Sequence, residues 1–328
     1  PQWILATQRM PPSALFTNNG DGTFTDRSVE LGFVTDGHVW TILPADLNGD
    51  GRIDLFVGTD VAISEGLYTT GRFTATHPRA SSVFLQNERG DFTRHSLGPP
   101  GDHPSTPMGA AFVYPISGGD PRLFLTGMPE DYLYSLEGAP EEWVDEAQWA
   151  GVKGESSLKK YTTGWAVKNL DYDRDGNGDL LVVNGTLDGE PGAPPLDQFI
   201  LKNEKPGEPD VLWLNKGGRG VFANIEALAG LDVPHHGRSA MVADLDLDII
   251  PEICIGGWGS EIRCYHTTSP IGTHGIQIRP LTRWRGPAFN VQVEIESATV
   301  RAVALVNPFG SPYAGQDDVG AIIGIGGD

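Results

Sequence analysis

The chain has no long hydrophobic run and few basic residues. No stretch approaches 18 apolar residues, which excludes a membrane-spanning helix. Only 23 of the 328 residues are Lys or Arg, whereas 43 are Asp or Glu, so the formal net charge is −20 at pH 7. A surface of this charge repels phosphate, which excludes nucleic acid as the main partner. The excess of carboxylates favours a cation-binding protein.

Cysteine is almost absent as well. Cys254 and Cys264 flank a glycine-rich segment that predicts a hairpin turning near 257–260, with the two side chains on opposed strand positions. A cross-strand disulfide and a pair of buried thiols both remain open. The chain starts at Pro1 without a charged and apolar leader, so we expect a mature or trimmed product with no signal peptide. Asn184 begins a glycan-acceptor triplet that matters only in a secretory source.

Helical periodicity is nearly missing too. Short apolar runs are bounded by Gly, Pro, Asn and Asp, which indicates strands and turns. Two elements alternate along the chain. One is an apolar strand, a polar turn and an aromatic strand, at 15–24, 83–92, 133–143 and 212–222, with a weaker copy at 262–270. The other is a glycine- and aromatic-rich strand, a mostly acidic loop and an apolar strand, at 39–58, 109–127, 164–185 and 239–257.

Four-stranded units that repeat without helices predict an all-β fold, a β-propeller. A solenoid has more regular coils, and an ordinary β-sandwich would not alternate the two elements so strictly. We expect about five blades with the acidic loops between strands one and two, although long inserts at 59–80 and 184–209 leave six or seven open. Pairing of the orphan strands in 13–27 with those in 291–306 would close the ring and remove an open edge. The alternative is a tail that folds as its own small β unit.

Three of the four loops carry oxygen ligands at alternate positions of a nine-residue segment. Side chains at positions 1, 3, 5 and 9 and the backbone carbonyl at position 7 can surround one cation. The residues at these positions are Asp46, Asn48, Asp50, Arg52 and Asp54 in the first loop, Asp171, Asp173, Asp175, Asn177 and Asp179 in the second, and Asp244, Asp246, Asp248, Ile250 and Glu252 in the third. Because no Cys or His interrupts the loops, Ca²⁺ fits better than zinc. We expect about three structural Ca²⁺ ions.

The loops differ at the sixth position, where a sharp bend favours glycine. Gly51 and Gly176 satisfy this requirement and Ile249 does not, so we expect a distorted or weaker third site. The fourth copy, 114–122, has Arg122 in place of the last carboxylate and should bind no metal. An EF-hand is excluded, because its 12-residue loop lies between helices and ends in a bidentate Glu.

These units resemble FG-GAP/VCBS repeats, the calcium-loop blades also found in integrin α-chain propellers. The segment LFTNNGDGTFTDRSVELGF (15–33) resembles the stretch that precedes such a blade. We therefore assign 1–285 to the propeller. The resemblance implies a secreted, extracellular or cell-surface protein for adhesion, for binding a protein or glycan, or for surface assembly. It specifies no ligand.

The tail, 286–328, resembles the ASPIC/UnbV segment that often follows such repeats. Gly310, Tyr313 and Gln316 match its Gly-x-x-Tyr-x-x-Gln pattern. Ile-Gly-Ile-Gly at 323–326 departs from the usual Phe-Gly-Leu-Gly ending. We therefore treat the tail as a separate C-terminal β segment that closes the ring or packs on it.

Catalytic motifs are missing: there is no Gly-x-Ser-x-Gly elbow, phosphate loop, His-Glu-x-x-His or Cys-x-x-Cys. His38 and His236 lie eight residues before acidic loops, and His103 lies near the matching place, so the three could converge at the channel face opposite the loops. Separate turn histidines are the simpler interpretation. We favour a binding module over the alternative, a sugar lyase or dehydratase with a histidine-lined site. Trp258, in a glycine-rich turn, is the tryptophan best placed for sugar stacking.

Overall fold

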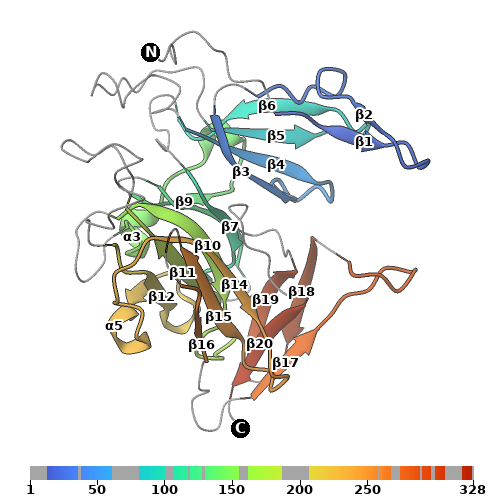
Figure 1. Cartoon of the computed structure of the whole chain (residues 1–328). Coiled ribbons are helices and arrows are strands. Elements are labelled where there is room, and N and C mark those ends of the chain that lie inside the picture. Colours follow the sequence, from blue (N-terminus) through green and yellow to red (C-terminus); the bar gives the residue numbers. More distant parts are fainter. Residues whose placement is uncertain are drawn as a thin grey trace, which may run out of the picture.

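The computed structural model describes residues 13–35, 38–60, 81–99, 107–116, 119–127, 130–154, 162–186, 207–257, 259, 261–266, 274–288, 290–296, 300–306 and 320–326. Short apolar runs between turn-rich segments form antiparallel strands along the whole chain (Figure 1). The strands are β1 (Phe16–Asn18), β2 (Phe24–Asp26), β3 (His38–Ala45), β4 (Asp54–Asp60), β5 (Ser82–Gln86), β6 (Phe92–Ser96), β7 (Ala110–Val113), β8 (Arg122–Leu125), β9 (Tyr132–Ser135), β10 (Gly164–Leu170), β11 (Asp179–Asn184), β12 (Val211–Asn215), β13 (Phe222–Asn224), β14 (Gly237–Ala243), β15 (Glu252–Gly257), β16 (Arg263–Tyr265), β17 (His274–Ile278), β18 (Val291–Glu296), β19 (Arg301–Val306) and β20 (Ala321–Gly326). The helices of the described part are single turns, namely α3 (Ala147–Ala150), α5 (Glu226–Ala229) and the 3₁₀ turns Pro140–Glu142 and Lys216–Gly218.

Four antiparallel sheets repeat one design. Their strand orders are β3-β4-β5-β6, β7-β8-β9, β10-β11-β12-β13 and β14-β15-β16, so each sheet consists of consecutive strands. The first strands β3, β7, β10 and β14 contact one another in that order, and consecutive sheets therefore meet along their first strands. The all-β prediction is confirmed, and the arrangement is consistent with a β-propeller-like fold.

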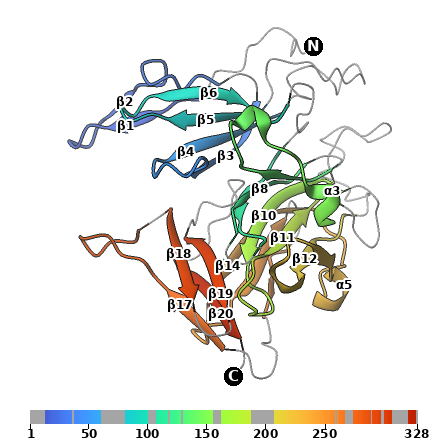
Figure 2. The same cartoon turned by 180° about the vertical axis from the view of Figure 1, so that it is seen from behind.

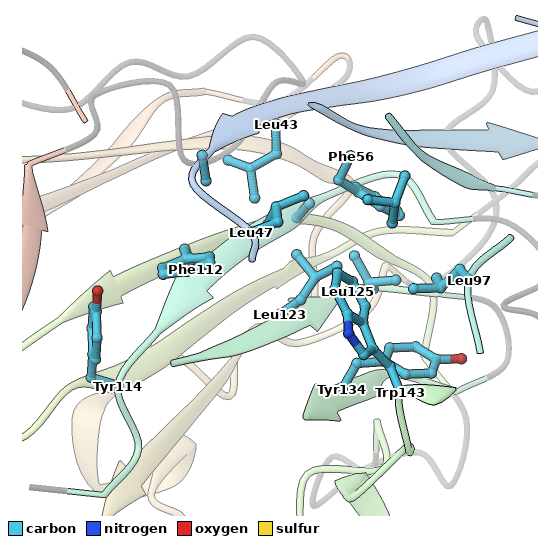
Figure 3. Packing of buried hydrophobic residues seen from close by; sticks show 13 residues of the cluster. Leu43, Leu47, Phe56, Leu97, Phe112, Tyr114, Leu123, Leu125, Tyr134 and Trp143 are labelled. Atoms are coloured by element: carbon cyan, nitrogen blue, oxygen red, sulfur yellow. The ribbon is translucent and has the colours of Figure 1, made fainter. Parts of the chain in front are cut away.

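The hydrophobic core lies between neighbouring sheets. Successive residues of β7 point to opposite faces, so Phe112 packs toward the sheet of β3–β6 and Val113 toward that of β10–β13. Leu43, Phe56 and Trp143 are fully buried in the first of these interfaces (Figure 3). Because both faces of β7 are covered, all of its residues are buried and apolar, without the alternation of a half-exposed strand.

The β1–β2 hairpin is a separate two-stranded sheet. Phe16 and Phe24 are 59% and 62% exposed, whereas Phe84, which matches Phe16 in the repeat, is fully buried. The hairpin is thus the outer half of a blade that has no inner strands among the described residues. Four blade-like sheets are seen in this part of the chain instead of the five predicted, and they do not close a ring there.

The predicted pairing of 13–27 with 291–306 is not formed in this structure. β18 and β19 pair with each other, and β17 pairs with β20. The apolar side of β18–β19 is already covered, since Ala302 and Val306 pack with Ala321 and Ile323 of β20. No strand of the β1–β2 hairpin pairs with β18 or β19 among the described residues. The tail therefore adopts the alternative arrangement, a small β unit of its own.

This C-terminal unit comprises β17, β18, β19 and β20 and lies beside the first strands of the sheets (Figure 2). The strand β17, which precedes residue 286, pairs with β20 of the tail. Val303 and Leu305 of β19 pack against the core cluster of β3 and β7. The Tyr114 hydroxyl donates to Gln292 Oε1 at 3.0 Å. The unit is thus joined to the sheets by apolar and polar contacts.

Cys254 and Cys264 are directly opposed in the β15–β16 ladder and form a disulfide, so the cross-strand alternative is confirmed. A disulfide is compatible with a secreted protein.

Asn184 ends β11, is fully buried and donates from Nδ2 to Pro209 O at 2.9 Å, so the folded chain does not present it to a glycosyltransferase. No helix within the described ranges has the length and apolarity needed to cross a membrane.

Candidate metal centres

The three acidic loops occupy the same place in three sheets. Loop 1 (46–54) joins β3 to β4, loop 2 (171–179) joins β10 to β11, and loop 3 (244–252) joins β14 to β15. The predicted location between the first and second strands is therefore confirmed. Each loop directly follows the first strand of its sheet; β10 and β14 contact each other, whereas β7 lies between β3 and β10.

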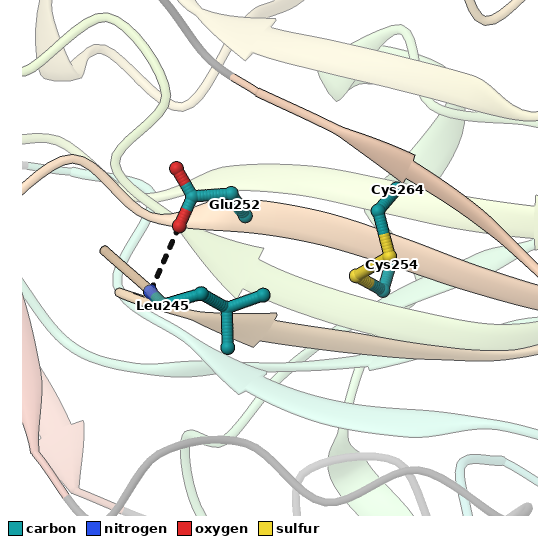
Figure 4. The surroundings of a disulfide bond; sticks show 4 residues. All are labelled: Leu245, Glu252, Cys254 and Cys264. Carbon is teal, nitrogen blue, oxygen red and sulfur yellow. Dashed lines mark hydrogen bonds between the residues drawn. A yellow bond between two sulfur atoms is a disulfide. The ribbon is translucent and has the colours of Figure 1, made fainter.

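One hydrogen-bond frame recurs in the loops. The carboxylate at position 9 accepts from the backbone N–H at position 2, and the carboxylate at position 1 accepts from the N–H at position 6. The position 9 bonds are Leu47 N to Asp54 Oδ2 at 3.0 Å, Tyr172 N to Asp179 Oδ2 at 2.7 Å and Leu245 N to Glu252 Oε2 at 2.8 Å (Figure 4). The position 1 bonds are Gly51 N to Asp46 Oδ2 at 2.8 Å, Gly176 N to Asp171 Oδ2 at 3.0 Å and Ile249 N to Asp244 Oδ2 at 3.1 Å. These bonds turn the acidic side chains into the loop.

The backbone also repeats, with positive φ at positions 4 and 6. Position 6 is Gly51 at 81°, Gly176 at 88° and Ile249 at 67°. Loop 3 therefore keeps the shared conformation, contrary to the distortion expected from its missing glycine. Having isoleucine instead of glycine at position 6 strains the backbone of loop 3, because a β-branched residue rarely adopts a positive φ.

Glycine at position 249 is expected to make the protein about 1 kcal/mol more stable than alanine does there. The left-handed conformation costs a non-glycine residue roughly 1–2 kcal/mol, and the greater chain entropy of glycine offsets part of that gain. Ile249 is only 36% exposed, so glycine and alanine both remove apolar burial there, and alanine is the reference that removes nearly the same amount. Urea unfolding in saturating calcium measures the change. Ile249→Ala keeps the strain and is the reference, and an Ile249→Gly midpoint at or below that of Ile249→Ala would contradict the assignment.

Loop 2 has the donor set that fits a cation best. Oxygens of Asp171, Asp173 and Asp179 lie within 4.8 Å of one another. Asp171 Oδ1 and Asp173 Oδ1 are buried without a hydrogen-bond partner. Burial raises the pKa of Asp171 to about 7, of Asp173 to about 6 and of Asp179 to about 8, and neighbouring carboxylates add to each shift. Unpaired buried oxygens and mutually repelling carboxylates are what a hard cation satisfies.

Loop 3 gains a ligand that the sequence analysis missed. Asp244, Asp246 and Glu252 form one group of close oxygens, and His266 joins Asp246 and Asp248 in a second. The His266 Nδ1 atom lies 2.9 Å from Glu252 Oε1. The signal was a change within the repeat, since His266 directly follows β16, where the matching residues of the first and third sheets are leucines. Its imidazole gives loop 3 a mixed nitrogen and oxygen donor set, which first-row transition metals accept more readily than calcium does.

Loop 1 contains a cationic side chain of its own. The guanidinium of Arg52 pairs with Asp50, and its Nε donates to Gln86 O at 2.8 Å. Sequence reasoning assigned only the Arg52 carbonyl to the site. Asp54 is fully buried, and burial raises its pKa despite hydrogen bonds from two backbone N–H groups. A cation in loop 1 therefore competes with Arg52 for Asp50.

The fourth copy of the loop has an arginine where the other three end in a carboxylate. Arg122 takes the place of the last carboxylate and donates from Nε to Glu146 Oε2 at 2.7 Å. Arg122 also donates to the backbone carbonyls of Asp120 and Pro121. An internal guanidinium thus fills the position where the other loops concentrate negative charge.

The histidines are only partly described. His38 begins β3, but its side chain lies outside the described residues, as do His103 and Trp258, so their predicted roles stay predictions. His236 is buried, and burial lowers its pKa, with nearby Arg238 adding to the shift. The neighbouring His235, also buried, places Nε2 2.6 Å from Asp210 Oδ2.

Residues 4–57 match the family model of the FG-GAP-like repeat. The matched stretch includes the β1–β2 hairpin, β3 and loop 1, so the FG-GAP resemblance is supported there. No protein with a curated description matches the chain.

Two solved structures are similar to this chain at low identity. One concerns specific recognition of non-reducing terminal N-acetylglucosamine by an Agrocybe aegerita lectin, with a TM-score of 0.33 and 13% identity over 76% of this chain and 73% of that chain. The other is BBS1N in complex with ARL6DN, with a TM-score of 0.37 and 12% identity over 84% of this chain and 78% of that chain.

Proposed function

We propose that the chain is an extracellular binding module, a calcium-stabilised propeller-like protein of the FG-GAP type with an ASPIC/UnbV-like C-terminal segment. The observation that carries the proposal is loop 2, where two buried carboxylate oxygens lack partners beside a third carboxylate. The same hydrogen-bond frame in loops 1 and 3 extends the proposal to about three ions. The proposed calcium ligands are the oxygens assigned from sequence, and His266 is not among them.

Each loop contributes a preformed acidic turn at the end of an innermost strand. The backbone N–H at position 2 holds the position 9 carboxylate, which also anchors the third strand in two sheets: Gln86 N donates to Asp54 Oδ1 at 2.8 Å and Asn215 N to Asp179 Oδ1 at 2.7 Å. A bound Ca²⁺ would supply the positive charge that lets these carboxylates stay ionised while buried. The loops would then tie the first three strands of each sheet together, leaving exposed surfaces free to bind.

The partner we propose is an extracellular glycan or protein. Trp284 is 77% exposed, and an exposed indole ring suits stacking against a sugar or an apolar side chain. The guanidinium of Arg283 lies 4.3 Å from the centre of the Trp284 ring. The two side chains therefore present a cation and an aromatic ring together. Trp284 is therefore the first residue to test.

Glycan and extracellular-protein arrays in calcium should yield a saturable ligand, and Trp284→Ala should weaken its binding at least about tenfold. Trp149→Ala is the matched control, because it removes an indole of similar exposure from a different element. A parallel activity screen on uronic-acid and keto-sugar substrates should remain negative. Turnover there, or the lack of any ligand on both arrays, would overturn the assignment as a binding module.

A further inference from the structure

Loop 2 lies beneath the C-terminal unit. Gly324 N of β20 donates to Asp171 Oδ2 at 2.6 Å, and this contact is buried. A Cβ built on Gly176 would lie 2.7 Å from Val300 Cγ1, which shows how closely the unit covers the tip of the loop. A cavity of about 110 Å³ lies between loop 2 and the C-terminal unit. Asp171 lines this cavity on the side of the loop, and Ile323 lines it on the side of β20.

Two glycines of the C-terminal unit lie so close to loop 2 that a side chain would not fit at either position. A Cβ on Gly324 would lie 2.1 Å from Arg174 O, and a Cβ on Gly275 of β17 would lie 2.4 Å from the Arg174 guanidinium. Arg174 itself is buried. No larger residue fits at either glycine unless the unit moves away from the loop.

Loops 1 and 3 are not covered in this way. Among the residues that the structure describes, nothing lies within 4 Å of a Cβ built on Gly49 or Gly51 of loop 1. In loop 3, Leu247 at position 4 is 76% exposed, whereas Arg174 at the matching position of loop 2 is buried. Of the three acidic loops, loop 2 alone serves as a docking surface.

We propose that cation binding in loop 2 controls docking of the C-terminal unit, so that this loop is a metal-dependent clamp. The inference rests on the proposed calcium binding. Asp171 connects the two events, since Oδ2 accepts from Gly324 while Oδ1 is a buried oxygen without a partner. A cation at Oδ1 would fix the carboxylate in the orientation that Gly324 N requires. Without it, repulsion between Asp171 and Asp173 favours opening of the loop, which removes the surface that β20 contacts.

The coupling must be reciprocal, because both events use one carboxylate. Displacing the unit should weaken calcium binding at loop 2 by the factor by which calcium strengthens docking, about 5- to 150-fold for typical couplings. Gly324→Val tests this direction, since the new side chain would meet Arg174 O and leaves every acidic residue unchanged. Isothermal titration should then show one weakened site among about three.

Hydrogen exchange of the whole chain tests the other direction. In EGTA, exchange of β17, β18, β19 and β20 should rise at least about tenfold, and more than that of β8–β9, whose sheet lacks an acidic loop. Asp173→Ala, or the milder Asp173→Asn, should reproduce the rise in saturating calcium. Asp50→Ala is the matched control, because it removes a carboxylate from an uncovered loop and should leave the unit protected.

Two outcomes separate this inference from the proposed function. If titration shows calcium at loop 2 while EGTA and Asp173→Asn leave exchange of the C-terminal unit unchanged, the clamp is wrong and calcium binding stands. If titration shows no calcium binding at all, the proposed function fails and the clamp fails with it.

Discussion

Removal of calcium is expected to lower the melting temperature by roughly 15 °C. A cation that binds only the native state stabilises it by about 2.7 kcal/mol per site at a hundredfold excess over Kd, hence about 8 kcal/mol for three sites. For a chain of this size each kcal/mol shifts the melting temperature by about 2 °C. Calorimetry in calcium and in EGTA measures the difference.

Single substitutions should show how much each loop contributes to this decrease in melting temperature. Asp175→Ala removes a loop 2 ligand and should reproduce about a third of the shift, and Asp50→Ala should do the same for loop 1. Asp120→Ala is the matched control, because Asp120 is an exposed carboxylate in the loop that Arg122 has neutralised. Equal melting temperatures with and without chelator, together with no metal by elemental analysis, would refute calcium stabilisation.

Asp131→Asn is expected to stabilise the protein by up to roughly 4 kcal/mol at pH 8 and by almost nothing at pH 4. Asp131 is 2% exposed, with Oδ1 accepting from Gly127 N at 3.0 Å. Burial raises its pKa from the ordinary value of 3.8 to about 7, although Lys153 opposes the shift. The native state thus holds this proton more tightly than the unfolded state does. The resulting stability is complete below about pH 4 and is lost as the pH rises to about 7.

Denaturant unfolding of both proteins at pH 4, 6 and 8 in saturating calcium measures this difference. The gap between Asp131→Asn and the wild type should widen with pH, because asparagine cannot ionise. Asp21→Asn is the control, since hydrogen bonds from Thr23 lower the pKa of that exposed carboxyl and its loss cannot mimic the trend. A gap that is constant across this pH range would show that Asp131 does not titrate as assigned.

The candidate sites were predictable wherever their residues are neighbours in sequence. The carboxylates of each acidic loop lie within nine residues, and Arg122 disables the fourth loop from the same position. His266 was missed because it reaches loop 3 only through the pairing of β15 with β16. The burial of loop 2 was missed for a similar reason, since Asp171 and Gly324 meet across more than a hundred residues.

Local chemistry in the sequence determined the strands, the turns, the acidic loops and the opposed cysteines, because each depends on side chains a few residues apart. Only the tertiary structure decided which edges pair and which surfaces are covered. The tail packs β18–β19 on β20 and leaves Phe16 and Phe24 exposed, whereas the sequence was equally compatible with a closed ring. Such choices depend on the apolar area that competing arrangements bury, and that area is a property of the assembled sheets.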